Sequence, residues 1–230
     1  MLSGSVTEHN SLGVAMLVIF DCDGVLVDSE NLSNGVLAEM LAEQGLGMST
    51  AEARAAFQGM RLDEVLAAAE RMLGRALPPD WIERYERRRT IVFRADLQAI
   101  EGAASAVQAI QGAGVRVCVA SQGKLEKTSL SLQLTGLAPL FAEATRFSAY
   151  SVPRGKPSPD LFLHAAASMG AEPAACVVVE DTPSGVLGAA RANMRAIGYA
   201  ADADARALRA AGAAATIDAM ADLPPLLGIA

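Results

Sequence analysis

Short apolar runs that end at polar residues recur along the chain and predict a parallel β-sheet. Residues 14–20 are continuously apolar and stop at Asp21, and similar runs occupy residues 115–120 and 175–179. Runs of this length with branched side chains are typical of strands that are buried on both faces. A polar or glycine-bearing turn and a helical pattern follow each run, so we expect a doubly wound α/β fold with right-handed crossovers. Weaker strands of the same kind are expected at residues 194–198 and 214–218.

Residues 32–97 interrupt this alternation and predict an all-helical insertion. No comparable apolar run occurs there, and apolar residues such as Leu37 and Leu41 recur at helical spacing. Pairs of glycines and prolines separate the successive helical patterns. We therefore expect an α/β core domain made of residues 1–31 and 98–230, with the insertion as a second, helical domain.

The composition restricts the partners of this fold. Hydrophobic side chains make up 52% of the 230 residues and charged ones 20%, which is too apolar for a disordered chain. The formal net charge of −7 provides no attraction to nucleic acid or to an anionic membrane surface. A small anionic substrate remains compatible, because it needs only a local cluster of positive groups. Nothing in the sequence implies an obligate protein partner.

The cysteines and the N-terminal residues indicate a cytoplasmic protein. Cys22, Cys118 and Cys176 lie in or beside apolar runs without C-x-x-C spacing, so we expect buried thiols and neither disulfides nor a zinc site. Residues 1–13 contain no Lys or Arg and therefore lack the positive region of a signal peptide. The apolar run that follows is too short to span a bilayer.

A charged run at residues 83–89 has two interpretations. Its arginines form either a basic patch for a ligand or one solvated face of a helix. The interleaved glutamates and the helical context favour the solvated face.

Two carboxylates follow the first predicted strand, at a place where chemistry is expected. Binding sites in parallel sheets form at the carboxyl ends of the strands. Asp21 and Asp23 lie two positions apart on this turn and can face the same crevice, while Gly24 allows a tight turn. Neighbouring carboxylates repel each other, so they usually share a cation or a proton.

Groups suited to a phosphate occur further along the chain. Ser121, Gln122 and Gly123 follow the second run, where a hydroxyl and turn amides at a helix start can surround a phosphate. Lys156 lies between a glycine and a proline, and the proline disfavours a helical backbone at the lysine. Taken alone, such a serine is more often a helix cap, and the lysine is equally typical of a surface residue.

A second pair of acids follows the third run. Glu180 and Asp181 come directly after five apolar residues, where carboxylates are costly without a partner. A hard cation such as Mg²⁺ prefers oxygen ligands and supplies that partner. The order of acid pair, serine, lysine and acid pair is much more specific than any single motif.

This set of residues resembles the haloacid dehalogenase-like (HAD) superfamily of phosphotransferases. The strings FDCDGVLVDSE and GKPSPD are similar to its β-phosphoglucomutase-like branch in particular. The resemblance implies a Rossmann-like parallel core, with residues 32–97 as a helical cap domain that opens and closes over the site. The residues that carry it are Asp21, Asp23 and Gly24, then Ser121, then Lys156 and Pro157, then Glu180 and Asp181.

The resemblance also implies roles for these residues. Asp21 is expected to be the nucleophile that forms an aspartyl-phosphate, and Asp23 the general acid and then the base. For the first of these steps the pKa of Asp23 should be raised in the complex with substrate. Ser121 and Lys156 would bind the phosphoryl oxygens. The expected ligands of Mg²⁺ are Asp21, the backbone carbonyl of Asp23, Glu180 and Asp181.

Individual residues discriminate between the reactions of the superfamily. Asp23 disfavours haloacid dehalogenase chemistry, and residues 32–97 contain no lysine to form the Schiff base of a phosphonatase. Ser33 stands where β-phosphoglucomutases have a cap-hinge histidine. We therefore expect a phosphatase, with a phosphosugar mutase as the alternative. A catalytically idle binding domain is the non-enzyme alternative, which the complete set of motifs disfavours.

The substrate is expected to be a small phosphorylated metabolite. Gly59 and Arg61 lie where this branch carries its substrate-specificity loop, and the F-x-G-x-R pattern is similar to that of some sugar-phosphate phosphatases. Arg61 is expected to contact a substrate carboxylate or hydroxyl, with Gln122 and Gly123 also binding substrate. A sugar or sugar-acid phosphate such as 6-phosphogluconate is the expected class.

Overall fold

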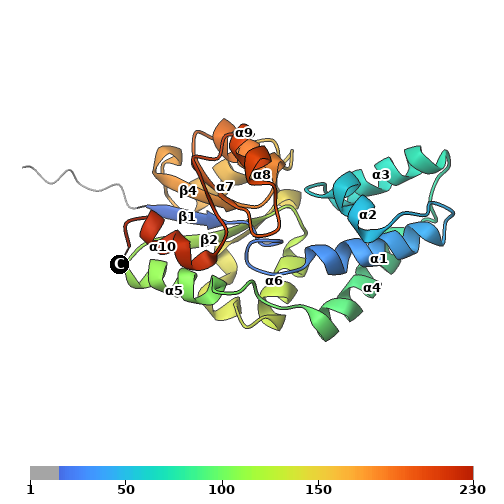
Figure 1. The fold of residues 1–230 in the computed structure, drawn as a ribbon, viewed down its shortest axis with the longest axis horizontal. Helices are drawn as coiled ribbons and strands as arrows, with labels where there is room; N and C mark the ends of the chain where they lie inside the picture. Colours follow the sequence, from blue (N-terminus) through green and yellow to red (C-terminus); the bar gives the residue numbers. More distant parts are fainter. Residues whose placement is uncertain (1–15, 230) are drawn as a thin grey trace, which may run out of the picture.

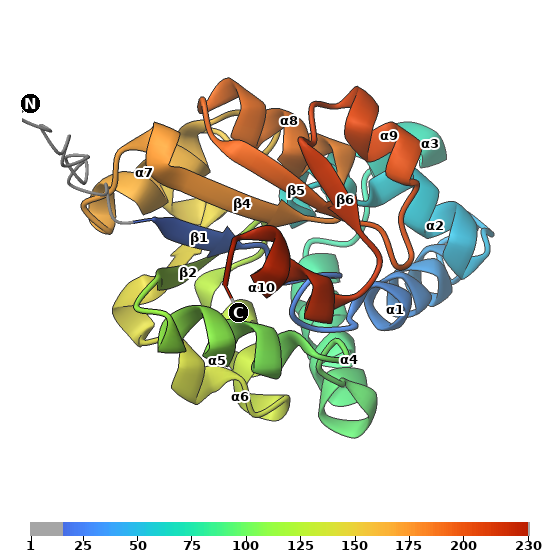
Figure 2. The ribbon, with the colours of Figure 1, turned by 60° about the vertical axis from the view of Figure 1, so that its left-hand side comes forward.

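The computed structural model of the protein describes residues 16–229, which form a six-stranded, fully parallel sheet with helices on both faces (Figures 1 and 2). The strand order is β3-β2-β1-β4-β5-β6, so the direction of winding reverses between β1 and β4. Ligands of such sheets bind at this reversal, beyond the carboxyl ends of the strands. The strands are β1 (Leu17–Phe20), β2 (Arg116–Ser121), β3 (Arg146–Ser148), β4 (Cys176–Glu180), β5 (Arg195–Tyr199) and β6 (Ala215–Ile217).

The central strand shows why both faces of the sheet are covered. Successive side chains of a strand point to opposite faces. Val18 and Phe20 of β1 therefore join one hydrophobic cluster, while Leu17 and Ile19 join another. The first cluster is covered by α5 (Ala103–Gly112), α6 (Leu125–Leu134) and α10 (Leu223–Leu226), and the second by α7 (Asp160–Ser168), α8 (Pro183–Arg191) and α9 (Ala205–Ala210).

Four helices between β1 and α5 form a lobe beside the sheet, at the right of Figure 1. The lobe has a hydrophobic cluster of its own, in which the rings of Trp81 and Tyr85 stack with centroids 5.9 Å apart. Phe93 and Leu97, at the other end of the last lobe helix, belong to the cluster of the sheet. This helix therefore joins the lobe to the core. The lobe helices are α1 (Glu30–Ala42), α2 (Thr50–Phe57), α3 (Leu62–Leu73) and α4 (Trp81–Asp96).

The observed elements confirm the predicted α/β fold and add one strand. The strand expected at residues 14–20 is β1, and its first two predicted positions, like residues 1–13, lie outside the described residues. The strand β3 was not predicted, because three residues with one apolar side chain give no recognisable run. Single turns of 3₁₀ helix complete the fold at Ala138–Leu140, Glu143–Thr145, Ala149–Ser151, Pro173–Ala175 and Met220–Asp222.

Two other sequence expectations concern the interior and the membrane. Cys22, Cys118 and Cys176 are buried free thiols, as predicted. Among residues 16–229, no helix has the length and apolar character needed to cross a bilayer.

Candidate active site

The register of the sheet brings Asp21 and Glu180 to one level. Phe20 of β1 pairs with Val119 of β2 on one side and with Val179 of β4 on the other. The next residue along β1 is Asp21, whose amide donates to the Val179 carbonyl at 3.0 Å. Glu180 ends β4 beside it. Asp21 and the second acid pair therefore meet at the reversal of strand order.

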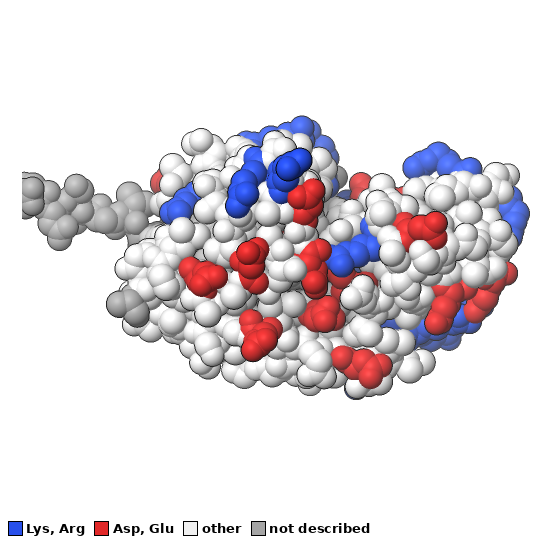
Figure 3. Space-filling model, in the orientation of Figure 1, with Lys and Arg blue, Asp and Glu red and all other residues white. Residues whose placement is uncertain are grey.

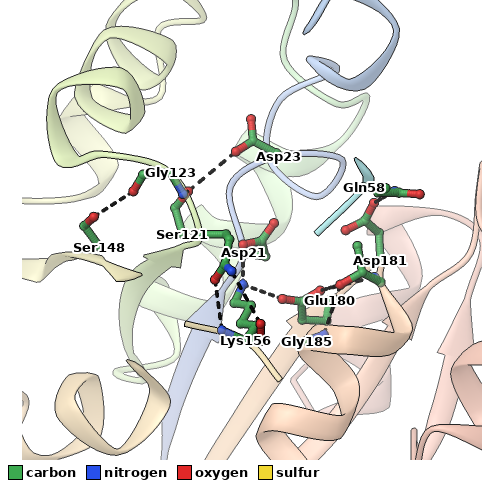
Figure 4. A network of polar contacts seen from close by, with 12 residues as sticks. Asp21, Asp23, Gln58, Ser121, Gly123, Ser148, Lys156, Glu180, Asp181 and Gly185 are labelled. Atoms are coloured by element: carbon green, nitrogen blue, oxygen red, sulfur yellow. Dashed lines mark hydrogen bonds and ion pairs between the residues drawn. The ribbon is translucent and has the colours of Figure 1, made fainter. Parts of the chain in front are cut away.

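Lys156 connects these carboxylates (Figure 4). Its Nζ lies 2.5 Å from Oδ1 of Asp21 and 2.5 Å from Oε1 of Glu180, and only 3% of its side chain is exposed. Burial lowers the pKa of Lys156, but the charges of the two carboxylates and their hydrogen bonds outweigh burial and raise it above its ordinary value. The lysine is therefore a permanent cation at the site.

Asp21, Glu180 and Asp181 form a cluster suited to a metal ion. One carboxylate oxygen from each lies within 4.8 Å of the others. Oδ1 of Asp181 is buried without a hydrogen-bond partner. Burial raises the pKa of Asp21 to about 7 although Lys156 acts against it, and burial likewise raises the pKa of Asp181. A hard divalent cation fits this set, because it compensates the negative charges of the buried carboxylates and prefers oxygen ligands.

Two glycines give the carboxylates room. A Cβ at Gly185 would lie 1.9 Å from Oε1 of Glu180, and a Cβ at Gly24 would lie 2.3 Å from Oδ2 of Asp181. Gly24 also has a positive φ of 75°. Both backbone segments thus approach the acids at distances that any side chain would prevent.

Asp23 lies apart from the acid cluster and has an unexpected partner. Its carboxylate accepts hydrogen bonds from Nζ of Lys127 and from the Ser29 hydroxyl, and Ser121 Oγ lies 3.5 Å away (Figure 4 shows the contact with Ser121). Burial raises the pKa of Asp23, but Lys127, Ser29 and Arg89 outweigh it and lower the pKa below its ordinary value. The raised pKa that we expect for Asp23 concerns the complex with substrate, and it stays a prediction.

Lys127 itself was not predicted as a site residue. It lies on α6, six positions beyond Ser121, and 9% of its side chain is exposed. The available signal was its helical position, one turn after the Ser121 turn, but a lysine on an amphipathic helix is ordinarily a surface residue.

The Ser121 turn and the Lys156 loop support each other. The Gly123 amide donates to Ser121 Oγ at 3.0 Å, and the Ser148 hydroxyl donates to the Gly123 carbonyl at 2.7 Å. Oε1 of Gln122 accepts the backbone N–H of Lys156 at 3.0 Å. The side chain of Gln122 thus holds the lysine loop in place.

A cavity of about 140 Å³ lies between the lobe and the carboxyl ends of the strands. The lobe approaches the acids directly, since Nε2 of Gln58 donates to Oδ2 of Asp181 at 3.3 Å. Of the predicted site residues, those lining the cavity are Asp21, Asp23, Gly59, Gln122, Gly123, Lys156 and Glu180.

Arg61 has a different environment from the one expected. Its guanidinium pairs with Asp63 at 3.1 Å and lies 4.5 Å from the centre of the Tyr150 ring. Arg61 borders a neighbouring groove beside the Lys156 loop instead of the main cavity. Because its charge is already paired, this placement disfavours the predicted contact with a substrate carboxylate.

Comparison with known families identifies the fold and the site together. The profile described as "haloacid dehalogenase-like hydrolase" matches residues 15–193. The chain belongs to this family. Its members among the curated relatives include 6-phosphogluconate phosphatase of Escherichia coli (strain K12), 32% identical over 186 residues, which are 80% of this chain and 82% of the relative. Hexitol phosphatase B of the same strain is 29% identical, with 79% and 82% of the two chains covered. The protein is an enzyme, a HAD-like phosphatase.

Solved structures of the family agree with this assignment. A HAD family hydrolase from Deinococcus radiodurans R1 with bound phosphate and sodium superposes with a TM-score of 0.75 at 34% identity, covering 94% of this chain and 96% of the other. A putative β-phosphoglucomutase from Thermotoga maritima has the same fold, with a TM-score of 0.75 at 24% identity and coverage of 94% and 100%. The predicted β-phosphoglucomutase-like type of HAD fold is thereby confirmed.

Proposed function

We propose that the enzyme is a Mg²⁺-dependent phosphatase of a small sugar or sugar-acid phosphate that acts through an aspartyl-phosphate. One observation carries this proposal. Nζ of Lys156 lies between the carboxylates of Asp21 and Glu180, and a buried, unpaired oxygen of Asp181 lies in the same cluster. A carboxylate attacks a phosphate dianion only where cations offset the repulsion, and this cluster supplies one cation and the ligands for a second.

In the first step an oxygen of Asp21 forms a bond to phosphorus as the ester bond breaks. Lys156 holds the carboxylate in place and offsets the charge on the phosphoryl oxygens. Mg²⁺, held by Asp21, Glu180, Asp181 and the backbone carbonyl of Asp23, would supply further positive charge for the same oxygens. Ser121 is buried at the end of β2, where its hydroxyl contacts Asp23 and the Gly123 amide.

Asp23 transfers the protons in this scheme. In the first step Asp23 gives a proton to the leaving oxygen. In the second step it takes a proton from a water molecule, whose oxygen bonds to phosphorus while the bond from phosphorus to Asp21 breaks. The pairing with Lys127 favours the carboxylate form of Asp23, which suits the second step. For the first step Asp23 must bind a proton and weaken its contact with Lys127.

The lobe is proposed to be the cap domain, residues 32–97, that closes the site. Gln58 reaches Asp181 from the lobe, and Gly59 lines the cavity. Closure excludes water while the ester is bound and strengthens the electrostatic interactions inside. The relatives named for 6-phosphogluconate and hexitol phosphates support a polyhydroxylated substrate.

The charge distribution agrees with a small substrate. On the face shown in Figure 3, acidic side chains occupy the middle, and basic ones gather at the upper edge and around the lobe. That face offers no continuous basic surface among the described residues, as a nucleic-acid partner would require. We propose a small phosphorylated metabolite as the partner of this enzyme.

Phosphate release from sugar, sugar-acid and hexitol phosphates, with and without Mg²⁺, tests the proposal. We expect Mg²⁺-dependent release by the wild type and none by Asp21→Asn, with an unchanged circular dichroism spectrum for the variant. Release that persists in Asp21→Asn would contradict the proposed nucleophile. Conversion of β-glucose 1-phosphate in the presence of a bisphosphate activator, without net phosphate release, would instead establish the mutase.

A further inference from the structure

One cation of the cavity forms no ion pair with a carboxylate of residues 16–229, although its charge acts on Asp23. Lys156 pairs with Asp21 and Glu180, Lys127 pairs with Asp23, and Lys124 pairs with Glu86 at 2.7 Å. The fourth cation that lines the cavity is Arg89 of α4. No carboxylate of residues 16–229 lies within 4.0 Å of its guanidinium in an ion pair. This arginine belongs to the charged run for which the sequence favours a solvated helix face.

Two aromatic rings hold Arg89 in place. Its guanidinium carbon lies 5.1 Å from the centre of the Tyr85 ring and 5.8 Å from that of Phe93. These contacts position the guanidinium through cation–π attraction but supply no formal negative charge. The arginine is therefore oriented and still able to bind an anion through its N–H donors.

The neighbours of Arg89 show which end of the substrate it faces. Lys127 lies 5.7 Å from the same Phe93 ring and contacts Asp23. The phosphoryl group belongs at Asp21, and the leaving oxygen at Asp23. A substrate that continues past Asp23 would meet Lys127 and Arg89, which line the same cavity. Arg89 also borders the groove between α4 and α6 that continues from the cavity.

We infer that Arg89 binds a carboxylate of the substrate at the end remote from the phosphate, with Lys127 adding positive potential. The inference rests on the proposed function, whose substrate class it narrows to phosphorylated acids. A carboxylate carries one negative charge and matches one unpaired cation. A second phosphate group would carry about two negative charges. The planar guanidinium also matches a carboxylate in a bidentate geometry.

The test compares two substrates that differ only at this end. 6-Phosphogluconate carries a carboxylate where glucitol 6-phosphate carries a hydroxymethyl group. We expect the wild type to have a kcat/KM about tenfold or more higher for the acid. In Arg89→Met, which keeps an apolar stem against Phe93, the preference for the acid over glucitol 6-phosphate should fall by about that factor through a higher KM for the acid. An effect of Arg89 on Asp23 would apply to both substrates and leave this ratio unchanged. Arg89→Lys should restore part of the preference.

Matched variants distinguish this role from others. Arg87 lies on the same helix, has 66% of its side chain exposed and pairs with Glu83. Arg87→Met should therefore leave the kinetic constants for both substrates unchanged. Arg61→Met tests the loop that the sequence favours. If Arg61→Met removes the preference and Arg89→Met does not, the inference is overturned. Equal losses with both substrates in Arg89→Met also overturn it, and so does a preferred hexose 1,6-bisphosphate.

Failure of the proposed function has a separate signature. If the wild type releases phosphate from no ester, the phosphatase proposal falls, and calorimetric titration of the same two compounds decides the inference. Tighter binding of the acid to the wild type than to Arg89→Met, with glucitol 6-phosphate unchanged, supports it. Equal binding by both proteins, or binding of neither compound, overturns it.

Discussion

At the scale of single residues, the backbone beside the acids depends on the absence of side chains. We predict that Gly185→Ala greatly reduces phosphatase activity and stability, because the new Cβ would overlap the Glu180 carboxylate, whose oxygen lies 1.9 Å from that position. Residual activity and the urea midpoint measure the effect. Gly112→Ala is the matched control: α5 is helical there with open space around the position, so we expect about 0.4–1 kcal/mol of stabilisation. Wild-type activity in Gly185→Ala would contradict the packing argument.

Lys156 gives a second prediction at this scale. Lys156→Met leaves Asp21 and Glu180 buried without their cation, so the free energy of unfolding without Mg²⁺ should fall by about 3–5 kcal/mol, and phosphate release should be lost. Urea denaturation at pH 8 measures the loss. The loss should be smaller at pH 5, where Asp21 takes up a proton instead.

The control for this variant is Arg154→Met in the same loop. Arg154 pairs with Asp160, but 72% of its side chain is exposed, so removing it should cost less than about 1 kcal/mol. If both variants lose the same stability, the buried ion pairs are not what stabilises the loop.

At the scale of elements, the short strand β3 matters more than its length suggests. It leads into the turn Ala149–Ser151, and the Tyr150 hydroxyl there accepts the Leu62 N–H of the lobe at 3.0 Å. The same hydroxyl donates to Asp63 at 3.3 Å. The core thus holds the first turn of α3, and with it the loop that carries Gly59.

We predict that Tyr150→Phe weakens closure of the lobe. Loss of about one net hydrogen bond corresponds to roughly a fivefold rise in KM, with a smaller change in kcat. Small-angle scattering with Mg²⁺ and a phosphate mimic should show a smaller compaction than for the wild type. Tyr199→Phe, in β5, removes a hydroxyl from another strand end and should change neither quantity. An unchanged KM and scattering profile in Tyr150→Phe would exclude this role for the hydroxyl.

At the scale of the whole molecule, we expect the buried acids to couple stability to pH and to the proposed Mg²⁺. Burial raises the pKa of Asp21 from 3.8 to about 7 and raises that of Asp181. A carboxyl group with a raised pKa in the folded state contributes stability when protonated, and this stability is lost as pH rises through the folded pKa. The lowered pKa of Asp23 acts in the opposite sense only below its ordinary value of 3.8.

We therefore predict that the metal-free protein has a lower Tm at pH 8 than at pH 5. Mg²⁺ should raise the Tm more at pH 8, because the cation competes with protons for the same carboxylates. Scanning calorimetry at both pH values, with and without Mg²⁺, measures the effect, and Na⁺ at equal ionic strength is the control. A Tm that rises with pH without Mg²⁺, or an equal Mg²⁺ effect at both values, contradicts the coupling.

The sequence by itself determined the α/β fold and the residues at the strand ends. Continuous apolar runs predict strands buried on both faces, and parallel strands carry their following residues to one edge. This rule directly predicts the site positions of Asp21, Ser121, Glu180 and Asp181. The resemblance to the HAD family assigns Lys156 to the same site. The domain boundaries at 31/32 and 97/98 and the roles of these residues stay predictions.

Only the tertiary structure decided which side chains complete the cavity. Lys127 and Arg89 lie within helices whose sequence patterns also suit a solvated face, and Tyr150 follows a strand too short to recognise. Their partners are 104 residues away for Lys127 and 88 for Tyr150, so no local pattern encodes these contacts. The pairing of Asp23 with Lys127 therefore depends on how α6 packs against the sheet, because the charge nearest in space determines the electrostatics of a site. Arg61 and Asp63, in contrast, are only two positions apart.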